Sequence, residues 1–278
     1  MSETARIAVV IPCYRDGVLA AQAVASIDEG EPVEIVVVDD ASDDLPTEAA
    51  LAGLEGNGVI VVRQRLNTGP GPARISGLAA TTAPYVFPLD ADDLAVPGAL
   101  GAMADRLDAN PDAVVCYGDY VEFGETELMR AVPDEIDPFR LAYTNEYPIS
   151  AMFRRSALES IGLWPGMRAY EDWHVWMTFA ERGLPGVHLG AGSPTYKRRL
   201  HGHRLLTAAK SHHSELYGQL RRDHPRLFAE LGEHRRRSSM SRARQVIYPV
   251  LYGSRRRWGW EAHVKRMLDR VGLWTMRR

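Results

Sequence analysis

Short apolar runs without polar interruption recur along residues 1–119 and alternate with segments of helical spacing. A strand with one solvated face alternates apolar and polar residues, whereas a strand that is buried on both faces is apolar throughout. Runs of the second kind predict buried strands at 7–11, 34–38, 59–63, 85–89 and 113–117. The segments between them predict helices at 18–27, 46–54, 72–80 and 97–107. This alternation predicts an α/β fold in which helices flank a mainly parallel sheet on both faces.

The composition is that of an ordinary soluble globular protein, with 278 residues of which 45% are hydrophobic and 25% are charged. No apolar run reaches the ~20 residues that a membrane-spanning helix requires. Polar Ser2, Glu3 and Thr4 near the start are not typical of a secretory signal. Cys13 and Cys116 are too few and too far apart for a disulfide framework or a zinc site. We therefore expect a cytoplasmic protein.

Common phosphate-binding motifs are absent from the sequence. It contains no Walker A loop, and its one glycine-rich loop, residues 69–74, follows the third expected strand rather than the first. Pro70 and Pro72 also remove two backbone N–H groups that a phosphate would use. A Rossmann dehydrogenase or a P-loop kinase is therefore not expected.

Charge is divided unevenly along the chain. Residues 1–195 hold 12 Lys and Arg against 30 Asp and Glu, whereas residues 196–278 hold 21 against 6. The basic tail predicts helices at 216–220, 241–251 and 261–271. Its arginines at 255–257, beside Trp258 and Trp260, are typical of contact with the inner face of a membrane. Packing on the acidic body or pairing in a homodimer would explain the same charge, so these alternatives stay open, and no nucleic-acid partner is expected.

Acidic clusters follow two of the expected strands directly. Asp39 and Asp40 end the second strand, and Asp90, Asp92 and Asp93 follow the fourth. Ligands of a parallel sheet bind beyond the carboxyl ends of its strands. So many carboxylates at one edge repel one another unless a cation neutralises some of them, and hard divalent ions prefer such oxygens. The clusters favour a Mn²⁺ or Mg²⁺ site shared with a substrate diphosphate, although Asp also commonly caps turns and helices.

With these clusters in view, the sequence resembles the inverting, metal-dependent glycosyltransferases of family two, which have the GT-A fold, over residues 7–206. The motifs that carry the resemblance are Val9-Val10-Ile11-Pro12-Cys13-Tyr14, Val38-Asp39-Asp40-Ala41-Ser42, Asn67-Thr68-Gly69 with Ala73-Arg74 and Gly77, Asp90-Ala91-Asp92-Asp93, and Glu171-Asp172-Trp173. One departure is Ile75, where the third motif usually has Asn. The resemblance implies a nucleotide-sugar half over 1–119, an acceptor half over 120–206 and a basic helical extension over 207–278.

The resemblance also implies roles for individual residues. Asp172 would be the general base. Donor contacts would come from Pro12, Tyr14, Asp39, Asn67, Arg74, Asp90 and Ala91. Asp92 and His201 would ligate the metal, and Arg198, Arg199, Glu171 and Trp173 would contact the diphosphate or the acceptor.

For several of these positions the residues themselves leave a structural alternative. A carboxylate in the first turn of a helix, such as Asp172, is kept ionised by the helix dipole but is often only a cap. Trp173 and Trp176 at helical spacing are typical of a core. His201 is one of nine histidines in the chain, so it carries little weight by itself as a ligand.

The expected function is metal-dependent, inverting transfer of a sugar from a nucleoside-diphosphate sugar to a hydroxyl of a saccharide, lipid-linked or other acceptor, in envelope polysaccharide, glycolipid or other glycoconjugate synthesis. A UDP- or dTDP-type donor is favoured because the Asp39 carboxylate can accept the N3–H of uracil or thymine. Two alternatives are a sugar nucleotidyltransferase and a binding module that holds the nucleotide sugar without turnover. The nucleotidyltransferase ranks lower because the turn after the first strand, residues 12–17, lacks the glycine-rich loop of that class.

Overall fold

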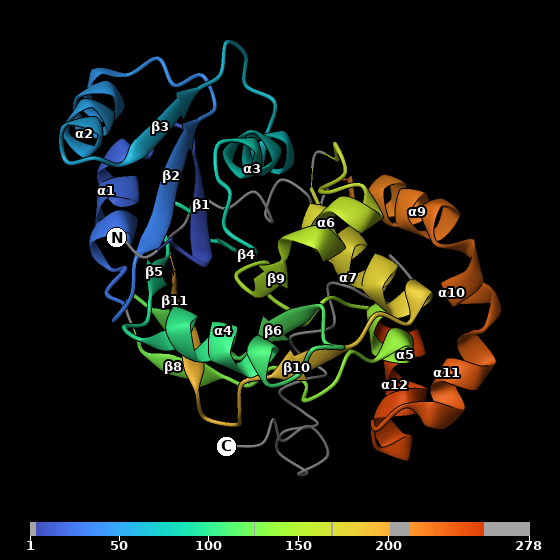
Figure 1. Cartoon of the computed structure of the whole chain (residues 1–278). Coiled ribbons are helices and arrows are strands. Elements are labelled where there is room, and N and C mark those ends of the chain that lie inside the picture. The colour runs from blue at the N-terminus through green and yellow to red at the C-terminus, as the bar shows by residue number, and fades with distance from the viewer. Residues whose placement is uncertain (1–3, 125, 168, 201–211, 253–278) are drawn as a thin grey trace.

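The computed structural model describes residues 4–124, 126–167, 169–200 and 212–252. Seven strands form its central sheet (Figure 1), in the order β10 (Gly186–His188), β6 (Val115–Tyr117), β9 (Met152–Arg154), β4 (Tyr85–Pro88), β1 (Ile7–Cys13), β2 (Val33–Asp39) and β3 (Ile60–Arg63). All neighbouring pairs are parallel except those that β9 makes with β4 and β6. The expected α/β fold with a mainly parallel sheet is confirmed.

Helices cover both faces of this sheet. Val9 and Ile11 of β1 pack in one apolar cluster with α1 (Gly17–Ala25), α2 (Leu45–Gly56) and α4 (Ala99–Asp108). Val10 between them faces the opposite cluster, which includes side chains of α3 (Pro70–Ala79), α6 (Arg155–Ile161) and α7 (Glu171–Arg182). Successive side chains of a strand point to opposite faces, so an unbroken apolar run buries both. This is why the strands lack polar alternation.

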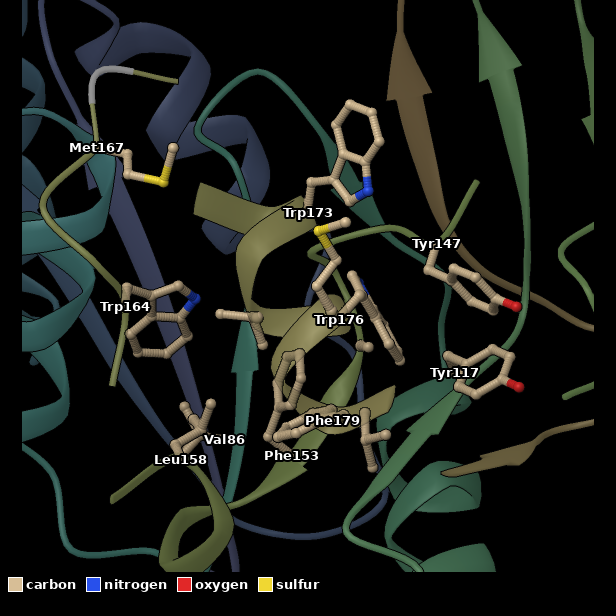
Figure 2. Close-up of a cluster of buried hydrophobic side chains, with 14 of the residues drawn as sticks. Val86, Tyr117, Tyr147, Phe153, Leu158, Trp164, Met167, Trp173, Trp176 and Phe179 are labelled. Atoms are coloured by element: carbon tan, nitrogen blue, oxygen red, sulfur yellow. The ribbon is translucent and has the colours of Figure 1, made fainter. Parts of the chain in front are cut away.

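The second cluster is rich in aromatic rings (Figure 2), several of which project from α7. Trp176 is fully buried and meets Tyr117 edge-to-face at 5.4 Å between ring centroids. Trp173 is 4% exposed. Both indoles donate to backbone oxygens, Trp173 to Leu141 at 2.7 Å and Trp176 to Pro148 at 3.0 Å. The core interpretation of this aromatic pair is confirmed, and the pair fixes the position of α7 beneath the cleft described below.

A second sheet has the order β5 (Leu94–Ala95), β11 (Pro194–Arg199), β7 (Asp119–Phe123) and β8 (Leu128–Arg130). The sequence carries no clear signal for this sheet, because its strands are short and most of them mix charged with apolar residues. Residues 149–153 also predict a strand by their sequence, but β9 begins only at Met152. Residues 144–150, which we call the cleft loop, form neither helix nor strand.

The described part of the basic tail forms α9 (His213–Asp223), α10 (Pro225–Ala229), α11 (Leu231–Arg237) and α12 (Arg242–Tyr252). These helices, orange to red in Figure 1, lie along α7 and α5 (Pro138–Leu141). Leu216, Leu220 and Leu227 join the cluster around α7, and the Tyr217 hydroxyl donates to the Ala142 carbonyl at 2.6 Å. Residues 212–252 therefore pack on the body.

Two of the expected tail helices coincide with α9 and α12, whereas the one at 261–271 and the arginines at 255–257 lie outside the described residues. Among the residues that the structure describes, no helix is long and apolar enough to cross a membrane.

Candidate active site

A cleft of about 730 Å³ opens where the carboxyl ends of β1, β2 and β4 meet the start of α7. Most of the predicted site residues line it: Pro12, Tyr14, Asn67, Arg74, Asp90, Ala91, Asp92, Glu171, Asp172, Trp173, Arg198 and Arg199. Asp39 is not among the lining residues, and His201 lies outside the described part of the chain. Residues far apart in sequence thus meet at the edge of the sheet that the strand-end carboxylates predicted.

The turns after β1 and β2 form one end of the cleft. Tyr14 is 42% exposed, and the Arg15 guanidinium lies 5.2 Å from the centre of its ring. Arg15 and Ala41 both have positive φ, an unusual conformation for residues other than glycine that often marks functional sites. The Asp39 carboxylate accepts the Ser42 N–H at 2.9 Å, so it stabilises the second turn. Its contact with a nucleobase stays a prediction.

Asp40 organises the neighbouring loop, a role that the sequence analysis did not assign. It is 3% exposed, and its carboxylate accepts the N–H of Thr68 at 2.8 Å and of Gly69 at 2.7 Å. Gly69 has a φ of +90° and precedes α3. Asp40 therefore holds Asn67 and its neighbours at the cleft. The two adjacent aspartates at the end of one strand were the sequence signal: because neighbouring side chains point in different directions, Asp39 and Asp40 can hold different segments.

Arg74 links two cleft-lining carboxylates that are far apart in the sequence. It is 2% exposed and donates from Nη2 to Asp90 Oδ1 at 2.7 Å and from Nη1 to Glu171 Oε1 at 3.1 Å. Burial lowers the pKa of Arg74, but the charges and hydrogen bonds of Asp90 and Glu171 outweigh burial and raise it. The guanidinium therefore stays charged, and it joins α3 to the start of α7.

Asp90, Asp92 and Asp93 each place a carboxylate oxygen within 4.8 Å of the others, close enough to share one ion. Asp93 is 4% exposed and accepts the Arg199 N–H at 2.9 Å. Burial and the charges of Asp90 and Asp92 raise the pKa of Asp93 well above its ordinary range. Three hard oxygen donors with mutual repulsion fit a divalent cation such as Mn²⁺ or Mg²⁺. Asp93 was not predicted as a ligand, but its carboxylate lies close enough to Asp90 and Asp92 to take part in holding an ion.

The two arginines of β11 are held by protein groups at the cleft. Arg198 pairs with the nearly buried Glu122 and lies 4.7 Å from the ring centre of Tyr120. Arg199 donates from Nε to the Asp92 carbonyl at 2.9 Å. Their predicted contact with a diphosphate stays a prediction, while their visible role is to join the second sheet to the acidic turn.

Asp172 lies half-buried in the first turn of α7. Its Oδ1 accepts the Trp173 N–H at 2.7 Å, and its Oδ2 accepts a hydrogen bond from Asn145 Nδ2 at 2.9 Å. Burial and the charge of Glu171 raise the pKa of Asp172 to about 7, although the bonds from Trp173 and Asn145 and the charge of Arg74 act against this. The helix dipole alone does not keep this carboxylate fully ionised, contrary to expectation, because desolvation is the larger effect. A group with this pKa can exchange protons at neutral pH.

Comparisons with known proteins show which family this chain resembles in sequence. The model of glycosyl transferase family 2 matches residues 8–171, more than half of the chain. Succinoglycan biosynthesis protein ExoO of Rhizobium meliloti is 36% identical over 132 residues, which are 44% of this chain and 38% of that protein. ExoU of the same organism is 42% identical over 88 residues, 31% of this chain and 26% of that protein. The aligned segments thus span well under half of these relatives.

Solved structures show the same fold at low sequence identity. TarS 1-349 of S. aureus, in complex with UDP-GlcNAc, aligns at a TM-score of 0.64 with 18% identity, over 86% of this chain and 69% of that chain. The mannosyltransferase PcManGT of Pyrobaculum calidifontis, in complex with GDP-Man and Mn²⁺, aligns at a TM-score of 0.62 with 18% identity. The alignment covers 96% of this chain and 81% of that chain. The chain therefore belongs to glycosyl transferase family 2 and has the GT-A fold of glycosyltransferases.

Proposed function

We propose that this chain transfers a glycosyl group from a nucleoside-diphosphate sugar to an acceptor hydroxyl with inversion at the anomeric carbon. One observation carries the proposal. A carboxylate with a pKa of about 7, Asp172, lines the same cleft as the three-aspartate cluster of Asp90, Asp92 and Asp93. Such a cleft combines a proton acceptor with a site for a cation and a diphosphate, which are the two needs of this reaction.

The donor would bind along the strand ends. The base would lie against Pro12 and the exposed ring of Tyr14, and the diphosphate would lie toward Asp90, Asp92 and Asp93. These aspartates would hold Mn²⁺ or Mg²⁺, which when bound would neutralise the charge that develops on the leaving diphosphate. The two solved relatives carry UDP-GlcNAc and GDP-Man. For this chain we propose a UDP- or dTDP-type donor. Asp39 lies next to the cleft-lining Asp40, and while one of its carboxylate oxygens accepts the Ser42 N–H, the other would accept the N3–H of uracil or thymine.

Asp172 would act on the acceptor. As the acceptor oxygen attacks the anomeric carbon, its proton passes to the Asp172 carboxylate and the bond from that carbon to the diphosphate oxygen breaks. The bonding electron pair leaves with the nucleoside diphosphate, and attack opposite to it inverts the anomeric centre. A positioned base of this kind typically raises the rate by a factor of roughly 10²–10⁴. Arg74 and the first turn of α7 place the base relative to Asp90.

We propose a saccharide or lipid-linked acceptor in polysaccharide or glycolipid assembly, since two relatives are proteins of succinoglycan biosynthesis. A cytoplasmic enzyme with peripheral membrane contact would suit such an acceptor. On α12, Arg242, Val246 and Val250 follow one another at four-residue spacing, and all three side chains are exposed. Co-sedimentation with anionic but not neutral vesicles, weakened by salt, would support this contact. The absence of binding at low salt would leave the tail as a packing or dimer element.

The proposed function is tested by following nucleotide products over a panel of nucleotide sugars. Release of nucleoside diphosphate that requires both an acceptor and Mn²⁺ or Mg²⁺ supports transfer. Pyrophosphate as a reactant or product would instead indicate a nucleotidyltransferase, and binding without turnover would indicate a module that only holds the nucleotide sugar. A thermal-shift panel of nucleoside diphosphates with Mn²⁺ and with EDTA identifies the base, because ligand binding stabilises the native state by mass action.

A further inference from the structure

Asn145, a residue that neither the sequence nor the family match singled out, contacts the proposed base directly. It lies in the cleft loop, all of whose residues line the cleft. Its Nδ2 donates to Asp172 Oδ2 at 2.9 Å, and its own Oδ1 accepts the Tyr147 N–H at 3.1 Å. The second bond fixes which end of the amide faces Asp172, because only an oxygen can accept the Tyr147 N–H.

This orientation discriminates between the two protonation states of Asp172. An ionised carboxylate oxygen accepts the Asn145 N–H, whereas a proton on the same oxygen would point at another donor. Among the described residues, the charged or titratable groups that interact with Asp172 include Glu171, which raises its pKa, Arg74, which lowers it, and Tyr170, whose own pKa the Asp172 charge raises. Among these neighbours, Asn145 is the uncharged side chain that favours the ionised form through a hydrogen bond.

The cleft loop that carries Asn145 is held from both sides. The next residue, Glu146, forms an ion pair with the buried Arg140 and accepts the hydroxyl of Tyr248 at 2.5 Å. Tyr147 is 2% exposed, and its hydroxyl donates to the Glu135 carbonyl at 2.6 Å. Tyr248 belongs to α12, so the C-terminal helices contribute to the position of the loop.

We propose that Asn145 is the positioning residue of the general base: it aims Asp172 Oδ2 and favours its ionised form, and α12 supports it through Glu146. The proposal rests on the proposed function, since it assumes that Asp172 is the base. It adds to the proposed active site a residue that lies outside the five family motifs, on a loop that the C-terminal helices help to hold. It also gives those helices a part in the reaction, beyond their packing.

The test is the pH dependence of kcat/KM for Asn145→Leu, which keeps the volume of the side chain and removes the donor. Without the hydrogen bond the pKa of Asp172 rises, so the acidic limb of the profile moves to higher pH. On that limb each unit of displacement lowers the rate about tenfold, and the loss disappears at high pH. Asn145→Asp, which adds a negative charge beside Asp172, should move the limb further in the same direction. Donor binding, measured by thermal shift, requires the folded protein. It should be unchanged in both variants, which would show that they fold.

Three outcomes separate the failure of this inference from the failure of the proposed function. If Asp172→Asn is inactive at every pH and both Asn145 variants keep the wild-type limb, Asn145 has no role in positioning the base. A uniform loss of rate at all pH values, with no displacement, would also overturn the inference, because it indicates a structural role only. If Asp172→Asn itself remains active, the proposed function is the part that is wrong.

Discussion

Two walls of the cleft are held in place by different interactions. The strand-end wall, formed by residues 12–14, 40 and 90–93, follows directly from the strands, and backbone hydrogen bonds to Asp40 and Asp93 fix its turns. The opposite wall is the cleft loop, which has no regular structure and is fixed by side chains from other elements, among them Arg140 and Tyr248. The sheet therefore sets the proposed donor side, whereas the proposed acceptor side depends on contacts that distant substitutions can alter.

This difference suggests that the acceptor side can change without disturbing the donor side. Arg74 is the exception, because it connects Asp90 of the strand-end wall with Glu171 at the start of α7. A substitution on one wall should change either donor binding or the acceptor step, and only residues at this junction should change both. Substitutions at single positions can test that separation.

The largest effect is expected for Asp172→Asn. The variant keeps the size of the side chain and one acceptor oxygen but cannot take a proton, so kcat should fall by roughly 10²–10⁴. Donor affinity, measured by thermal shift with the nucleoside diphosphate, should stay unchanged. Glu159→Gln, an exposed carboxylate on α6, is the matched control and should retain full activity. Near-normal turnover of Asp172→Asn would leave Asp172 as a group that only caps α7.

On the strand-end wall, Asp92→Ala should abolish the Mn²⁺-dependent part of the stabilisation by nucleotide. A ligand at 100 times its Kd stabilises the native state by about 2.7 kcal/mol, so the loss is readily measured in a melting experiment. The melting temperature without ligand should not change, and Asp112→Ala at an exposed site serves as control. Binding of the nucleotide with the same metal dependence as the wild type would contradict the role of Asp92 as a ligand.

The wild-type pH profile tests the proposed acceptor side alone. The base must be ionised, and burial and Glu171 raise the pKa of Asp172 to about 7. Activity should therefore rise through neutral pH and fall about tenfold per unit on the acid side. Donor binding measured over the same range should not follow this curve. A profile that is already flat from about pH 5 upward, near the ordinary pKa of a carboxyl group, would contradict the assignment.

The same contrast explains what could be predicted from sequence. The strand ends and the aspartates after them follow from local patterns, since an apolar run ending in Asp90 and Asp92 places both at the edge of the sheet. The second sheet, the bridge through Arg74 and the bond from Asn145 to Asp172 depend on segments that meet only in the folded chain. Asn145 lies in a stretch without periodicity, so no local signal distinguishes it from other polar loop residues.

A smaller effect is expected when the loop that Asp40 holds is loosened. Asp40→Ala leaves the N–H groups of Thr68 and Gly69 without their acceptor, at a cost of about 1–3 kcal/mol. If about 1.4 kcal/mol of this cost appears as weaker donor binding, donor affinity falls roughly tenfold, and we expect a loss of that size. The pH profile of kcat should stay in place. Asp105→Ala, which removes an exposed carboxylate from α4, is the control. A displaced pH profile would show that the two walls are not independent.

The smallest effect, expected for Tyr248→Phe, tests whether α12 acts on the cleft loop. The substitution removes one hydroxyl and its hydrogen bond to Glu146, which is worth about 1.5–3 kcal/mol because the acceptor is charged. Arg140 still holds Glu146, so the loop should relax only slightly. We expect a few-fold loss of kcat, a small displacement of the acidic limb to higher pH and no change in donor binding. Tyr252→Phe on the same helix is the control. If both variants lose stability equally and keep the wild-type pH profile, α12 supports the fold without influencing the base.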